Sequence, residues 1–78
     1  MKNLVIDSLE EAKSAMERGE YSSLETVIDK TCEPGTVRLL VRGFVRRAIN
    51  YQELESVRQE NIIGVLNDTI KVAKKHGY

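Results

Sequence analysis

Four arginines lie in the segment 34–52, which contains no acidic residue. They are Arg38, Arg42, Arg46 and Arg47. The guanidinium group of arginine donates hydrogen bonds in a planar fork that matches a carboxylate or a phosphate. A spacing of four residues places the first three along one stripe of a helix. The sequence therefore predicts a basic edge that binds an acidic group, either within the molecule or on a partner.

The charges are divided unevenly along the chain, although the formal net charge of all 78 residues is zero. Residues 1–33 carry four basic and eight acidic side chains, whereas residues 34–78 carry eight basic and four acidic ones. Such asymmetry can mark a nucleic-acid or membrane contact, or it can be neutralised when an acidic helix lies beside a basic one. Pairing within the chain or between subunits is favoured, because a neutral chain attracts a polyanion only weakly over long distances. Glu10, Glu17 and Glu25 are the expected acidic partners.

The other reactive residues form no recognisable catalytic or metal-binding motif. Cys32 has no cation beside it in the sequence to stabilise a thiolate, and we expect a buried structural cysteine. His76 is expected to be a frayed surface residue. One cysteine and one histidine provide neither a zinc-ligand set nor a catalytic triad, and five isolated glycines build no phosphate-binding loop. We therefore expect no cofactor, no metal and no enzymatic activity.

The length of 78 residues predicts one small helical domain over residues 1–78. Domains of this size bury a modest fraction of their surface and compensate with disulfides, metals or oligomerisation. Because the single cysteine and the single histidine leave only oligomerisation, a homodimer is favoured. No apolar run reaches the ~18 residues of a membrane-spanning helix, so no membrane partner is expected. A single free thiol makes the cytoplasm the default compartment.

Hydrophobic periodicity and capping residues predict an all-α fold. The expected architecture is a compact bundle of three to four helices at about 3–18, 23–32, 36–49 and 51–75. Gly19 is the expected end of the first helix, Ser22 begins a capping box for the second, and Asn50 is the candidate N-cap of the fourth. The alternative is an α+β fold with short strands at 4–6 and 37–45, since these segments also fit extended structure.

The predicted helix at 36–49 is apolar around much of its circumference and is expected to be central. Leu39, Gly43 and Arg47 fall on the side away from its apolar arc. Gly43 costs a helix interior about 1 kcal/mol relative to alanine, and close approach of another helix to this side would offset that cost. Arg58 falls on the apolar face of the predicted fourth helix, so either that helix breaks there or Arg58 reaches a carboxylate elsewhere.

These features favour a small non-enzymatic regulatory or adaptor protein that binds another protein through its arginine-rich helix. The expected partner-binding residues are Arg38, Arg42, Arg46, Arg47, Leu39, Gly43 and Arg58. The alternative is a nucleic-acid-binding or transcription-regulating dimer that presents the same helix to a duplex. Protein binding is preferred because the pI of about 6.6 is low for a dedicated nucleic-acid binder and aromatic residues do not interleave with the arginines.

Overall fold

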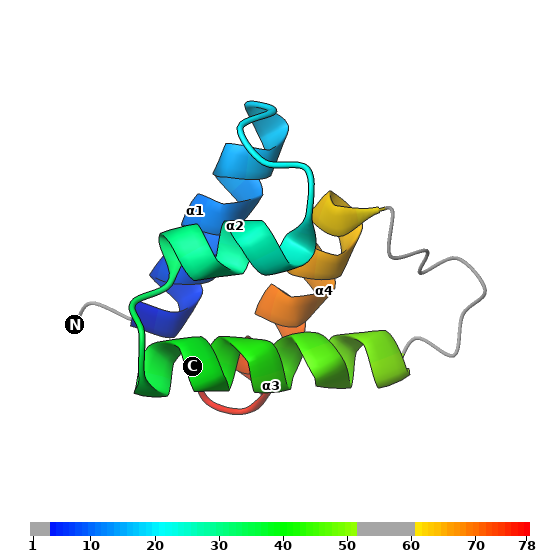
Figure 1. Cartoon of the computed structure of the whole chain (residues 1–78). Coiled ribbons are helices and arrows are strands. Elements are labelled where there is room, and N and C mark those ends of the chain that lie inside the picture. Colours follow the sequence, from blue (N-terminus) through cyan, green and yellow to red (C-terminus); the bar gives the residue numbers. More distant parts are fainter. Residues whose placement is uncertain (1–3, 52–60) are drawn as a thin grey trace.

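The computed structural model describes residues 4–51 and 61–78. This part of the chain contains four helices and no strand: α1 (Leu4–Glu17), α2 (Leu24–Thr31), α3 (Thr36–Tyr51) and α4 (Ile62–Lys75). Helices α2 and α3 run side by side in opposite directions, and α1 and α4 pack behind them (Figure 1). The predicted all-α bundle is confirmed. The α+β alternative is wrong, because the segments 4–6 and 37–45 lie inside α1 and α3.

Helix α1 has the buried face and the end that the sequence predicts. Leu9 and Ala12 are fully buried, and Met16 packs against the same core. The helix ends in a Schellman motif around Gly19, whose φ of 74° suits glycine. The amide of Gly19 donates to the carbonyl of Met16 at 3.0 Å, and the amide of Glu20 donates to that of Ala15 at 3.1 Å. Through these two hydrogen bonds, the motif satisfies carbonyls of the last helical turn that would otherwise have no donor.

Helix α2 begins one residue later than predicted. Its N-cap is Ser23, in extended backbone geometry, and its hydroxyl accepts a hydrogen bond from the amide of Thr26 at 3.2 Å. The expected capping box at Ser22 is therefore wrong by one position. Two adjacent serines provide equivalent capping oxygens, and the packing of Val27 and Ile28 into the core decides which of them is used.

Helix α3 continues past its predicted end at about Ile49. Asn50 lies inside this helix and is not the N-cap of the next one, which corrects the prediction. The N-cap of α4 is Asn61, whose side-chain oxygen accepts from the amide of Gly64 at 3.0 Å. Ala48 is buried and Ile49 packs against the core, so tertiary contacts favour a continued helix over the local capping signal. The segment 52–60, which includes Arg58 and much of the first part of the predicted fourth helix, lies outside the described residues.

All four helices contribute to one hydrophobic core. Leu9 of α1 and Leu66 of α4 are the largest fully buried side chains of this core. Val27 of α2 and Val41 of α3 are also fully buried. Helix α3 packs against each of the other three helices, and so does α1, so the core does not single out α3 as the central element. Helix α3 nevertheless keeps an exposed outer surface along its whole length. That surface carries the residues that were predicted to bind a partner.

Candidate functional site

Arg38 acts inside the fold. Its guanidinium donates to the backbone carbonyls of Asp29 at 2.8 Å and of Cys32 at 3.2 Å, at the C-terminal end of α2. The side chain is only 26% exposed, and Nε lies 3.8 Å from the carboxylate of Asp29. A cation at the C-terminus of a helix favours the helix dipole and satisfies carbonyls that have no helical donor. The residue predicted to bind a partner therefore joins α3 to α2.

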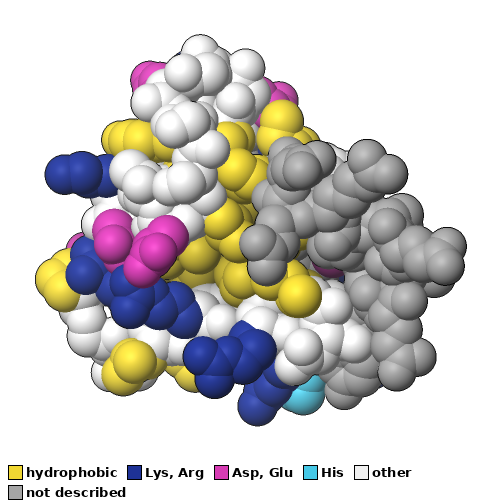
Figure 2. Space-filling view, turned by 45° about the vertical axis from the view of Figure 1, so that its right-hand side comes forward, with side chains coloured by type: hydrophobic (Ala, Val, Ile, Leu, Met, Phe, Trp, Pro, Cys, Tyr) yellow, Lys and Arg dark blue, Asp and Glu magenta, His cyan; other side chains and the backbone are white. Residues whose placement is uncertain are grey.

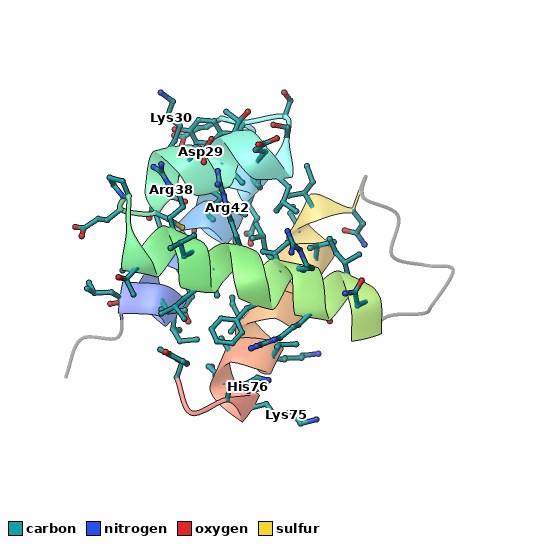
Figure 3. All side chains as sticks on the ribbon, turned by 60° about the horizontal axis from the view of Figure 1, so that its bottom comes forward. Asp29, Lys30, Arg38, Arg42, Lys75 and His76 are labelled. Atoms are coloured by element: carbon teal, nitrogen blue, oxygen red, sulfur yellow. The ribbon has the colours of Figure 1, made fainter. Side chains whose placement is uncertain are left out.

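Arg42 lies one turn further along α3 and also points toward Asp29 (Figure 3). One of its terminal nitrogens is 2.6 Å from the carboxylate oxygen Oδ1 of Asp29. The predicted pairing between an acidic and a basic helix is thus present, but its acidic partner is Asp29. The prediction of Glu10, Glu17 or Glu25 is wrong for Arg38 and Arg42. Both side chains of the Arg42–Asp29 pair remain substantially exposed, so the pair contributes little stability and stays accessible to a competing carboxylate.

Arg46 and Arg47 have different surroundings from the first two arginines. Among the described residues, neither forms an ion pair, and both are exposed. The guanidinium carbon of Arg47 lies 5.5 Å from the centre of the Phe44 ring, a cation–π geometry that holds this side chain along α3. Arg46 has no such contact among these residues. It is the arginine of the stripe whose hydrogen-bond donors are most available to a ligand.

An open groove separates α2 from the C-terminal half of α3 and the first turn of α4. Its floor is aliphatic: Leu24, Ile49 and Ile62 are half-buried there, and Ile28 and Val45 lie beneath them as buried core residues. Arg42 and Arg46 line it from α3, and Ser22, Ser23 and Glu25 line it from the beginning of α2. Figure 2 shows hydrophobic side chains gathered at the centre of this face, with basic side chains around its lower edge. The arrangement combines an apolar floor with one basic wall.

Leu39 and Gly43 form a second surface on the outer side of α3. Leu39 is 70% exposed, and a Cβ added at Gly43 would meet no atom within 4 Å. The expected close approach of another helix to Gly43 is therefore not made by the described part of the chain. This outer surface of α3 is open, whereas the surface of α3 beside α2 is concave.

Replacing Gly43 by alanine is expected to raise the free energy of unfolding by about 0.5–1 kcal/mol, because the helix interior favours alanine and the space is open. Urea unfolding followed by circular dichroism measures the change. Gly77→Ala is the matched control, and it should destabilise the protein because the φ of Gly77 is 94°. A loss of stability in Gly43→Ala would mean that a further element packs against this position.

Cys32 and His76 are both placed as predicted with respect to solvent. Cys32 is a buried free cysteine, and burial raises the pKa of its thiol, so a reactive thiolate is disfavoured. His76 is exposed, but it is not frayed, because it caps α4 and its amide donates to the carbonyls of Val72 and Ala73, each at 3.1 Å. Its ring centre lies 5.7 Å from that of Phe44. Neither residue lines the groove.

Within residues 4–51 and 61–78, no three or more His, Cys, Asp or Glu residues gather in a way that could hold a metal ion. None of the helices in the same part of the chain is long and apolar enough to cross a membrane.

Neither the floor of the groove nor the role of Asp29 was predicted from the sequence. A signal for the floor was present, because Leu24 and Ile28 recur at a spacing of four, as do Val45 and Ile49. That signal indicates an apolar stripe on each helix. It does not show that one residue of each stripe, Leu24 on α2 and Ile49 on α3, remains partly uncovered. Of the predicted partner-binding residues, the groove brings together Arg42 and Arg46, while Arg38, Leu39, Gly43 and Arg47 lie elsewhere on α3.

The fold and this surface define a small all-α protein with an arginine-lined apolar groove. Comparisons with models of protein families, with curated proteins and with solved structures found no match for the chain. Function is therefore inferred from the geometry of the groove.

Proposed function

We propose that this protein is a small non-enzymatic regulatory or adaptor protein that binds a segment of another protein in the groove between α2 and α3. The observation that supports this proposal most directly is the combination of an aliphatic floor with Arg42 and Arg46 on one wall. The half-buried Leu24, Ile49 and Ile62 leave apolar surface partly open to water, which is a common property of protein-binding sites. Arginine is frequent among the residues that contribute most to such interfaces, since it combines area, hydrogen bonds and charge.

The positions of the arginines support a protein partner over a nucleic acid. Arg38 is used to join α3 to α2, and the carboxylate of Asp29 lies beside Arg42. A phosphate backbone approaching this wall would meet the carboxylate of Asp29 beside Arg42, and Glu25 lies on the opposite wall of the groove. The aliphatic floor also provides no aromatic surface on which bases could stack. The nucleic-acid alternative is thus less well supported than it was from the sequence alone.

The homodimer and the cytoplasmic location that the sequence favours remain proposals. For the homodimer, α4 offers neither Val65 nor Thr69 to a partner, because both are buried within the chain. The outer surface of α3 around Leu39 and Gly43 stays exposed in the described part of the chain.

Arg46→Glu is expected to reduce capture of the partner by at least about tenfold, which corresponds to about 1.4 kcal/mol of binding free energy. The reversed charge would face carboxylates that the arginine attracts. The measurement is affinity capture from cell extract with the immobilised full chain, quantified by mass spectrometry for each captured protein. Circular dichroism of each variant establishes that it remains folded.

Lys71→Glu is the matched control, because Lys71 is exposed on α4 and does not line the groove. It makes the same change in net charge. Proteins captured by the wild type and by Lys71→Glu, but lost from Arg46→Glu, would support the proposal. Capture that is unchanged in Arg46→Glu, or lost equally in both variants, would contradict it.

A further inference from the structure

The floor of the groove indicates what kind of segment fits there. Its residues come from facing helices, with Leu24 and Ile28 on α2 and Val45 and Ile49 on α3. Each pair is separated by one helical turn, which is a rise of about 6 Å. The floor presents aliphatic side chains and no exposed strand edge to which a bound backbone could pair. A helix satisfies its own backbone hydrogen bonds, so it can lie on such a floor without leaving buried polar groups unpaired.

The two walls of the groove differ in charge. The wall on α3 carries Arg42 and Arg46, whereas the wall at the beginning of α2 carries Ser22, Ser23 and Glu25. Arg42 already contacts Asp29 at 2.6 Å, and Arg46 forms no ion pair among the described residues. A ligand that brings carboxylates to the α3 wall would pair with Arg46 and compete for Arg42. The same carboxylates would be repelled on the α2 wall by Glu25.

We propose that the ligand of the groove is an amphipathic helix of another protein, with an apolar stripe that covers the floor and acidic residues along the edge that faces Arg42 and Arg46. This inference rests on the proposed function and specifies the chemistry of the partner. Apolar residues at spacings of three and four over two turns would cover the floor. The acidic edge determines the orientation in which the helix lies, because electrostatic complementarity selects the register and the partner.

A second copy of this chain fits the groove poorly. Helix α3 contains no acidic residue, so its exposed face would bring further arginines to Arg42 and Arg46. Helix α1 is rich in glutamate, but its apolar face is buried in the core of its own chain. Neither helix can present an apolar stripe with an acidic edge while the chain remains folded. Helices α1 and α3 of a second copy are therefore poor occupants, and a different protein is the source that we propose.

The test uses two synthetic 18-residue helical peptides as probes, with the same leucine stripe and with either glutamate or lysine on both edges. Binding of each labelled peptide to the full chain is measured by fluorescence anisotropy at low salt. The glutamate peptide should bind at least about tenfold more tightly than the lysine peptide. Arg46→Glu should reverse this preference, and Glu25→Lys should strengthen binding of the glutamate peptide.

Arg47→Glu is the matched control, since it makes the same charge change on α3 at a residue that does not line the groove. It should change the affinity for either peptide far less than Arg46→Glu does. Equal affinities for the two peptides, or a larger effect of Arg47→Glu than of Arg46→Glu, would overturn the inference. So would photo-crosslinks from a probe at position 24 to a second copy or to the same chain, since either would identify a different occupant.

The peptide test and the capture test can fail separately. If capture depends on Arg46 but the glutamate peptide neither binds nor displaces the captured protein, the acidic helix is wrong and the proposed function stands. If the glutamate peptide binds as expected but no protein depends on Arg46 for its capture, the chemistry of the groove is supported and the proposed function is contradicted.

Discussion

Leu66→Ala is expected to lower the free energy of unfolding by about 2–5 kcal/mol, which is a large part of the stability of a small domain. Leu66 is 0% exposed and lies in the core that α4 shares with the other helices. Removing its side chain loses the free energy of burial and leaves a cavity that the surrounding helices close only partly. For a domain of this size, each 1 kcal/mol lowers the Tm by roughly 4–8 °C, so the shift in Tm should be obvious.

Urea unfolding monitored by circular dichroism measures this change, and Leu39→Ala is the matched control. The two variants lose the same atoms, but Leu39 is 70% exposed and its replacement should change the free energy of unfolding by less than about 0.5 kcal/mol. A similar loss in both variants would contradict the arrangement of α3 and α4. Improved solubility of Leu39→Ala would be compatible with the prediction, because the variant removes an exposed leucine.

Arg38→Ala is expected to lower the free energy of unfolding by roughly 1–3 kcal/mol, the range for losing hydrogen bonds from a charged donor at a partly buried site. The change removes the donors to the carbonyls of Asp29 and Cys32 and leaves them without those partners at the end of α2. It also removes the packing of a long side chain between two helices. Since α2 forms one wall of the groove, the same variant should weaken ligand binding indirectly.

Arg46→Ala is the control for Arg38→Ala, because it removes the same side chain from the same face of α3 two turns further along. Its effect on the free energy of unfolding should remain below about 0.5 kcal/mol, while its effect on binding should be direct. Urea unfolding and amide hydrogen exchange in α2 would be measured for both variants. Equal loss of stability, or unchanged exchange in α2 of Arg38→Ala, would show that Arg38 does not anchor this helix.

The division of the arginine stripe shows where prediction of the candidate site reached its limit. A spacing of four places Arg38, Arg42 and Arg46 on one edge of α3, and the structure shows this edge beside α2. Their separate roles depend on how far α2 extends along that edge. The end of α2 meets Arg38, while α2 has diverged enough at Arg46 to leave a groove. The local sequence around these arginines does not encode how far α2 lies from α3 at each of them.

The sequence by itself determined the helical fold and most helix boundaries. Periodic apolar residues and the glycine after α1 act over a few residues and need no tertiary context. The tertiary structure decided that Ser23 caps α2 in place of the predicted Ser22, and that Asn61 caps α4 in place of the predicted Asn50. It also decided that Asp29 pairs with α3 and that Leu24 and Val45 line an open groove. These outcomes depend on how the helices pack against one another, because packing free energy exceeds the small differences between competing local signals.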